Sequence, residues 1–180
     1  MHPLTQLIYH DMKPALGVTE PGAIAFAVAK AKAQIGGTVE LVELRLNSGM
    51  YKNAFTCGIP GSTQVGNLYA AALGATGADA QKGLECLDGI TDAQHKQAQQ
   101  LVDQGKVRAE MSEVTSRIYI EAGVTTDQGN ATVIIRDSHT NITEIRVNGD
   151  TVFLAQAEEI QDDGDLAAPI HSYTLAQLVD

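Results

Sequence analysis

Three short segments, far apart in the chain, carry side chains that could hold a small anion or move a proton. The first is residues 17–22 (GVTEPG), which stand before an alanine-rich run. Proline suits the first position of a helix, and threonine or glutamate can accept hydrogen bonds from its free N–H groups. We therefore expect Pro21 to start a helix that Thr19 or Glu20 caps. Because such a helix start attracts anions, Thr19 and Glu20 are candidates for binding a substrate carboxylate.

The second segment is residues 47–53 (NSGMYKN), which include Lys52 and Asn53, followed by the glycine-rich residues 58–62 (GIPGS). A glycine-rich loop before a helix can cradle a phosphate, but the P-loop pattern needs a lysine after its last glycine. Asn67 follows Gly66 here, so nucleotide binding is not predicted. Lys52 and Asn53 have a functional interpretation only through the resemblance described below. The alternative is that Lys52 is a solvated charge and Asn53 a turn residue.

The third segment is residues 138–142 (SHTNI), at the junction of two predicted strands. His139 is the titratable side chain of this segment, and its functional interpretation comes from the resemblance described below. The alternative is a structural or exposed histidine in a hairpin turn. Three other histidines have no partner at metal-ligand spacing, and we expect them on the surface; they are His10, His95 and His171. The acidic residues 158–165 look like a solvated loop. No metal site is therefore predicted.

Composition restricts the classes of function. The chain has 180 residues, 44% of them hydrophobic, and a net charge of −10. This charge argues against nucleic acid as a partner, because phosphate binding needs clustered lysine and arginine. No apolar run reaches membrane-spanning length, so no membrane is expected. The two cysteines, Cys57 and Cys86, are not paired as CxxC, and we expect reduced thiols in a cytoplasmic protein.

The pattern of apolar residues predicts helices first. We expect helices over residues 4–13, 21–35 and 91–104, a shorter one near 68–73 that Gly74 and Gly77 break, and another over 80–87. Alternation of apolar and polar residues predicts a strand over 38–46. Residues 50–57 have a mixed pattern, which we interpret as a strand or an irregular buried segment.

Residues 106–155 change to β-branched, roughly alternating segments. Turn signals of good quality occur at residues 127–129 (DQG) and 148–150 (NGD), and they predict hairpins. The fold class is therefore α+β, with N-terminal helices followed by an antiparallel β-meander that the 38–46 strand can join. We expect one domain over residues 1–155. Residues 156–180 are then an acidic linker and the start of a further helix at 172–179. We expect this helix to continue in a longer protein, or a second chain to complete the function.

The motifs occur in an order that resembles the L-cysteine desulfidase and L-serine dehydratase alpha-chain family, in its N-terminal part. The resemblance covers most of residues 10–155, and its motifs are 16–22 (LGVTEPG), 52–53 (KN), 58–61 (GIPG), 70–75 (AAALGA) and 139–142 (HTNI). The family has Gly-Cys-Thr-Glu-Pro at the first motif, and that cysteine is a ligand of a [4Fe–4S] cluster. This chain has Val18 there, and valine cannot bind iron. Family members are much longer, with their other cluster cysteines in a C-terminal part.

The resemblance implies a PLP-independent amino-acid lyase. In the family the cluster acts as a Lewis acid on the leaving thiol or hydroxyl, a base removes the Cα proton, and aminoacrylate hydrolyses to pyruvate and ammonia. Carried onto this chain, the resemblance gives substrate binding to Thr19, Glu20, Asn53 and Asn141. It gives a catalytic charge or proton-transfer role to Lys52 or His139.

Because Val18 replaces the family's cysteine ligand, two hypotheses about function remain. The [4Fe–4S] cluster is expected for the family, but we expect this chain alone not to bind it and to have no lyase activity, because a cluster needs three or four thiolates. Cys57 is the alternative as a substitute ligand. The partners expected for a lyase are a small amino-acid substrate, a C-terminal half or second subunit, and further copies in a homo-oligomer. The second hypothesis is a cluster-less paralogue that binds a small metabolite or a protein partner.

Overall fold

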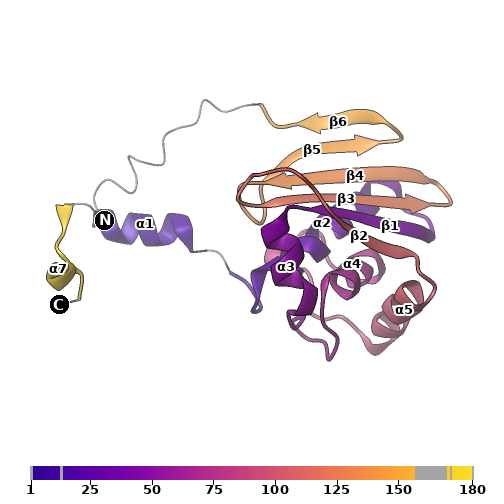
Figure 1. Cartoon of the computed structure of the whole chain (residues 1–180), viewed down its shortest axis with the longest axis horizontal. Helices are drawn as coiled ribbons and strands as arrows, with labels where there is room; N and C mark the ends of the chain where they lie inside the picture. Colours follow the sequence, from indigo (N-terminus) through magenta and orange to yellow (C-terminus); the bar gives the residue numbers. More distant parts are fainter. Residues whose placement is uncertain (1, 13, 157–169, 171, 180) are drawn as a thin grey trace. The chain divides into compact units, whose positions relative to one another are not determined.

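The computed structural model describes residues 2–12, 14–156, 170 and 172–179. These fall into two units, one of residues 15–155 and one of residues 1–14 with 156–180, and each is described by itself. The helices are α1 (Pro3–Asp11), α2 (Thr19–Ile35), α3 (Ser48–Thr56), α4 (Asn67–Thr76), the 3₁₀ helix η1 (Gly83–Glu85), α5 (Asp92–Asp103) and α7 (Leu175–Val179). The strands are β1 (Val39–Leu46), β2 (Val107–Met111), β3 (Tyr119–Thr126), β4 (Gly129–Arg136), β5 (Ile142–Val147) and β6 (Asp150–Leu154), as Figure 1 labels them.

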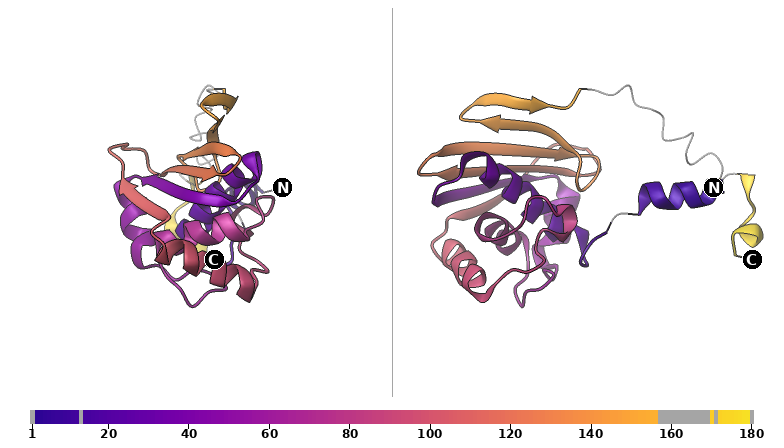
Figure 2. Two further views of the ribbon diagram at one scale, coloured as in Figure 1. Left: turned by 90° about the vertical axis from the view of Figure 1, so that its right-hand side faces the viewer. Right: turned by 180° about the vertical axis from the view of Figure 1, so that it is seen from behind.

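The larger unit is a six-stranded sheet with helices on one face. The strand order is β2-β1-β3-β4-β5-β6, and every neighbouring pair is antiparallel except β1 with β2. Figures 1 and 2 show α2, α4 and α5 on the same side of the sheet. The predicted α+β class, with helices preceding a mostly antiparallel sheet, is confirmed.

Helix α2 lies at the centre of the core. Nearly all of its residues from Pro21 to Ala31 are buried, because α2 packs on β3 and β4 on one side and on α4 on the other. Ile24 and Val28 are fully buried with Val124 and Val133 of the sheet in the same apolar cluster. A helix that is apolar all round belongs in a protein core, and its many alanines allow the neighbouring helix to approach closely.

Both hairpin predictions are confirmed. Residues 127–128 connect β3 to β4, and residues 148–149 connect β5 to β6. Asn148 and Gly149 have φ angles of 52° and 92°, the left-handed values that a two-residue turn of this kind requires.

The prediction for residues 106–113 is wrong in one respect. Strand β2 does not join the antiparallel meander but pairs with β1 alone, in parallel, with Leu44 opposite Ala109. The connection from β1 to β2 contains α3, α4 and α5. A long helical connection returns the chain to the same end of the sheet, and so the second strand runs parallel to the first.

Residues 50–57 also differ from the prediction, since they lie in helix α3 and its C-cap. Asn47 caps this helix, with its side-chain oxygen 3.4 Å from the Met50 N–H, and Met50 and Ala54 are buried four residues apart. Helix α4 likewise continues through Gly74 instead of breaking there. A Cβ at Gly74 would lie 2.6 Å from the Ala25 carbonyl oxygen, so this glycine lets α4 cross α2 at close range.

Of the remaining predicted helices, some form as predicted and one is reduced to a short 3₁₀ helix. Helix α5 is confirmed to within a residue of each end and has a capping box between Thr91 and Gln94. Over residues 80–87 only the short η1 forms. In the smaller unit, α1 occupies the predicted 4–13 region and the short α7 follows Thr174, whose hydroxyl accepts from the Gln177 N–H. The predicted acidic loop over 157–169 and His171 lie outside the described residues. Within those residues, no helix has the length and apolar character needed to cross a bilayer.

Candidate functional site

Four of the predicted site residues form one polar cluster, made of Thr19, Glu20, Asn53 and His139. The Thr19 hydroxyl lies 3.4 Å from His139 Nε2 and 3.4 Å from Glu20 Oε2. The Asn53 side-chain amide donates to Glu20 Oε1 at 3.2 Å. Since 120 residues separate Thr19 from His139, the fold and not the local sequence brings these groups together.

The first two members lie at the start of α2, where the structure corrects the predicted capping. The helix begins at Thr19 with Val18 as its N-cap, and Val18 makes no side-chain capping bond. Pro21 is therefore the third helical residue and not the first, and neither Thr19 nor Glu20 caps the helix. The side chains of Thr19 and Glu20 are instead directed to each other and to the neighbouring segments, while the first N–H groups of α2 have no intrahelical acceptor.

His139 is held half-buried in the turn between β4 and β5. Asp137 enters this turn with a φ of 68°, and the Asn141 amide donates to the Arg136 carbonyl at 3.0 Å, which closes the turn. Asn141 is thus exposed and fixes the backbone that presents His139, and it has no hydrogen bond to the polar cluster. The resemblance gives Asn141 a role in substrate binding, whereas the hydrogen bond of its side chain in the structure is with the backbone of the turn.

The electrostatic environment favours a neutral His139. Burial lowers the pKa of His139; the Glu20 carboxylate opposes this with the next largest effect, and the Arg117 cation lowers the pKa by a smaller amount. A neutral imidazole has one nitrogen able to accept a proton and one able to donate. The Thr19 hydroxyl has a single hydrogen, so when it donates to Glu20 it accepts from Nε2–H, which leaves the other ring nitrogen as the acceptor. The cluster can therefore take up a proton at His139.

Helix α3 contributes Asn53 but not Lys52. Adjacent helical residues point about 100° apart, so both cannot face the same neighbour. Asn53 faces Glu20, whereas Lys52 is exposed and makes no hydrogen bond or ion pair within the described part of the chain. Of the two catalytic candidates, only His139 is brought into the cluster.

Two further residues support the site, namely Arg117, which the sequence did not indicate, and Asn47, the first residue of the predicted segment 47–53. The Asp137 N–H donates to the Ile118 carbonyl, which extends the β3–β4 ladder by one step and places Arg117 alongside Ser138 and His139. The second is Asn47, whose buried side chain donates to the Ser116 carbonyl at 2.8 Å and the Arg117 carbonyl at 3.3 Å. A lone arginine before a strand gives no local signal, but an asparagine three residues before a buried methionine is a helix N-cap signal that could have located Asn47.

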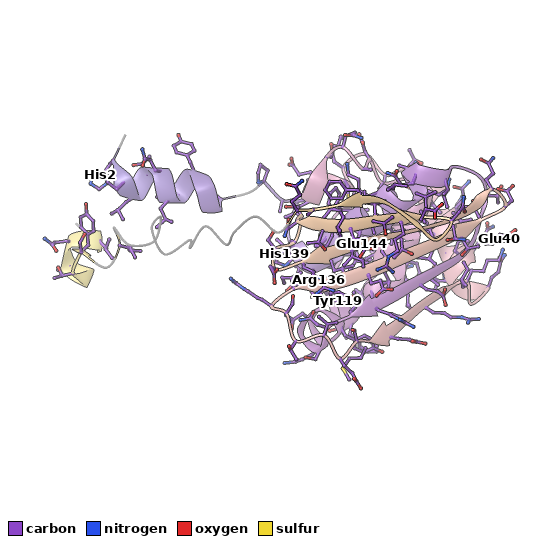
Figure 3. All side chains as sticks on the ribbon, turned by 90° about the horizontal axis from the view of Figure 1, so that it is seen from above. His2, Glu40, Tyr119, Arg136, His139 and Glu144 are labelled. Atoms are coloured by element: carbon purple, nitrogen blue, oxygen red, sulfur yellow. The ribbon has the colours of Figure 1, made fainter. Side chains whose placement is uncertain are left out.

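Other charged side chains lie on the open face of the sheet. Figure 3 shows Tyr119 and Arg136 toward the end of the sheet where His139 lies, with Glu144 further along and Glu40 at the far end. The Arg136 guanidinium lies 5.0 Å from the centre of the Tyr119 ring, and Arg146 pairs with Glu144 at 2.6 Å. These two arginines therefore have protein partners. No described residue makes a hydrogen bond or ion pair with the Arg117 guanidinium.

The residues around the cluster do not fit an iron–sulfur centre. Val18, at the position of the family's ligand, has a side chain without donor atoms and is 45% exposed. The Cys57 thiol donates to the Asn53 carbonyl at 2.6 Å, and Cys86 is buried with its pKa raised to about 12 by desolvation. Among the described residues no three histidine, cysteine or acidic side chains gather as metal ligands. Cys57 adjoins the cluster through Asn53, but one thiol does not make a ligand set.

Comparison with known proteins gives relatives whose name states no activity. The chain is similar to UPF0597 proteins. The one from Clostridium botulinum strain Langeland is 39% identical over 150 residues, 83% of this chain and 35% of the relative. Those from Oleidesulfovibrio alaskensis and Shewanella sp. strain W3-18-1 are 35% and 40% identical over 158 and 150 residues, covering 88% and 83% of this chain.

The chain spans a little over a third of the length of these curated relatives, 37% and 35% of the last two. No protein-family model matches it. The UPF0597 name carries no statement about desulfidase or dehydratase chemistry.

Proposed function

We propose that this chain provides the amino-acid-binding and proton-transfer part of a PLP-independent lyase that acts on L-cysteine or L-serine. One observation supports the proposal above the others. The segments that carry the resemblance to the desulfidase and dehydratase family, at residues 19–20, 53 and 139, meet in one polar cluster although they are far apart in the sequence.

Each member of the cluster has a role in binding such a substrate. The Glu20 carboxylate, held by the Asn53 amide, pairs with the ammonium group of the amino acid. The free N–H groups at the start of α2 attract its carboxylate. Neutral His139, oriented by the Thr19 hydroxyl, accepts the proton that leaves Cα. Loss of that proton and of the β-substituent gives aminoacrylate, which hydrolyses to pyruvate and ammonia.

Activation of the leaving thiol or hydroxyl is assigned to groups outside this chain. Val18 and the two separated thiols do not supply a set of cluster ligands among the described residues. We infer that a C-terminal half or a second subunit supplies them, in a protein that acts in the cytoplasm, where free thiols such as Cys57 and Cys86 persist. A homo-oligomer is compatible with this division of the site.

The proposal is tested by calorimetric titration of the purified chain with L-serine and L-cysteine. We expect saturable binding that Glu20→Gln weakens about tenfold or more, as loss of a charge-assisted hydrogen bond predicts. Glu40→Gln is the matched control, because Glu40 lies at the far end of the sheet from His139 (Figure 3). An intact, folded chain that binds neither amino acid contradicts the proposal. So does equal loss of affinity in both variants.

A second function is favoured by Val18 itself. An exposed apolar residue beside the cluster fits a paralogue that binds a small metabolite and performs no elimination. Anaerobic reconstitution with iron and sulfide distinguishes the two when it is performed on the full-length protein, or on this chain together with its additional polypeptide, with visible absorbance and pyruvate formation as readouts. For residues 1–180 alone we expect neither a stoichiometric cluster nor pyruvate. A complete lyase supplied with its additional polypeptide would yield pyruvate, and the binding-only paralogue would not.

A further inference from the structure

We propose that Arg117, together with the free N–H groups at the start of α2, recognises the carboxylate of the ligand in the polar cluster, and that Asn47 is the positioning residue that sets Arg117 in place. This inference rests on the proposed function, since it assigns a part of the same ligand to a residue that neither the sequence nor the resemblance indicated.

The first argument is the location of Arg117. Antiparallel pairing of Tyr119 with Arg136 continues through the bond from the Asp137 N–H to the Ile118 carbonyl at 2.9 Å. The next step places Arg117 beside the turn that holds His139. The guanidinium is close enough to His139 for its charge to act on the imidazole.

The second argument is that the Arg117 guanidinium is available. Arg136 lies over the Tyr119 ring and Arg146 forms two hydrogen bonds with Glu144. Arg117 is exposed, and among the described residues none makes an ion pair or hydrogen bond with its side chain. A planar guanidinium presents paired donors that match a carboxylate, which makes arginine the residue of choice for this group.

The third argument is that charges of opposite sign lie around His139. Glu20 carries the negative charge and shares the Thr19 hydroxyl with His139, while Arg117 carries the positive charge beside the turn that holds His139. A ligand with an ammonium and a carboxylate on one carbon presents the complementary pair. The arrangement thus favours a free amino acid over an amine or a carboxylic acid alone.

The fourth argument concerns Asn47, which is 6% exposed and uses its whole side chain. Its amide nitrogen donates to the carbonyls of Ser116 and Arg117, and its oxygen accepts from the N–H groups of Met50 and Tyr119. The same residue therefore caps α3, which carries Asn53, and holds the backbone of Arg117. One side chain fixes the relative position of two parts of the site.

The experiment compares L-serine with L-serinamide, which keeps the hydroxyl and the ammonium but lacks the carboxylate. Titrations are run by calorimetry on the full chain in mildly acidic buffer, where both ligands are protonated at nitrogen. We expect the wild-type chain to prefer L-serine by about tenfold or more, the value of a charge-assisted contact. Arg117→Gln should remove the preference by weakening L-serine alone, Arg117→Lys should restore part of it, and Arg108→Gln on the edge strand β2 should leave it unchanged.

Asn47→Asp tests the positioning role, because aspartate keeps the oxygen that caps α3 but cannot donate to the two carbonyls. We expect normal helix content by circular dichroism and a reduced preference for L-serine. A structural role alone would weaken both ligands equally and leave the ratio intact.

The outcomes separate this inference from the proposed function. A wild-type chain that binds neither ligand refutes the proposed function, and the role of Arg117 in it as well. A chain that binds L-serine and keeps its preference in Arg117→Gln overturns only the role of Arg117. A preference retained in Asn47→Asp overturns only the role of Asn47.

Discussion

Replacement of Gly74 by alanine should destabilise the protein, although alanine is the better helix former. The added Cβ would lie 2.6 Å from the Ala25 carbonyl oxygen and 2.9 Å from the Val28 Cβ, both in α2. These atoms belong to a buried helix packed on the sheet, so they cannot yield as the end of a flexible side chain would. Overpacking of this kind costs about 3 kcal/mol at the upper end of its range. Helix propensity returns about 1 kcal/mol, which leaves a net loss of about 2 kcal/mol.

The matched control is Gly49→Ala in the exposed first turn of α3. The nearest atom to its added Cβ is the Asn47 side-chain nitrogen at 3.8 Å, an ordinary contact. The same substitution should therefore stabilise here, by about 0.4–1 kcal/mol.

The assay is thermal unfolding followed by circular dichroism, supported by urea titration. For a chain of this size a net loss of about 2 kcal/mol lowers Tm by about 4–8 °C. A Gly74→Ala protein as stable as the wild type would refute the close crossing of α2 and α4. A Gly49→Ala protein destabilised to the same degree would show that the effect is not specific to the crossing.

Three further predictions concern titratable groups. The two thiols should differ in reactivity, since Cys57 is half-buried and Cys86 is buried with a raised pKa. Iodoacetamide should modify one thiol in a fast phase and the other in a slow phase. Cys57→Ser should abolish the fast phase without changing the slow one. The pKa of His139 is lowered from 6.5, so below that pH the folded state binds fewer protons than the unfolded state, and the free energy of unfolding should fall on acidification. In urea titrations, the free energy of unfolding of His139→Gln should depend less on pH over that range than that of His95→Gln. Burial and the Glu121 carboxylate raise the pKa of Tyr119 from 10 to about 12. The stability that this shift contributes is fully present below pH 10 and is lost as the pH rises toward 12. Tyr119→Phe should remove one late-titrating phenol from the absorbance at alkaline pH, and an unchanged titration would contradict the assignment.

The parts of the fold that local sequence determines were predicted correctly. The two hairpins follow from Asp127-Gln128-Gly129 and Asn148-Gly149, whose turn conformations need only adjacent residues. Helix α5 follows from its capping residues and its stop at Gly105. Pairing of β2 with β1 was not predictable in this way, because it depends on how three intervening helices pack. Gly74 was misjudged for the same reason, since the helix that needs its missing side chain is remote in sequence.

The candidate site shows the same division. Thr19, Glu20, Asn53 and His139 were selected by their chemistry and by the order of the motifs, and the fold brings them together. Lys52 was selected by the same reasoning, but its position beside Asn53 on a helix turns it to another face. Arg117 was missed because its proximity to His139 exists only in the β3–β4 ladder.

The place of β1 between β2 and β3 in the sheet has a consequence for biosynthesis. Leu44 pairs with Ala122, which leaves the ribosome 78 residues later. At about 5–20 residues per second, β1 and the apolar helix α2 wait about 4–16 s for the strand that covers them. The β3–β6 hairpins, in contrast, pair almost as soon as they are made. The nascent chain thus exposes this apolar helix during this interval, when a holding chaperone would protect it from aggregation.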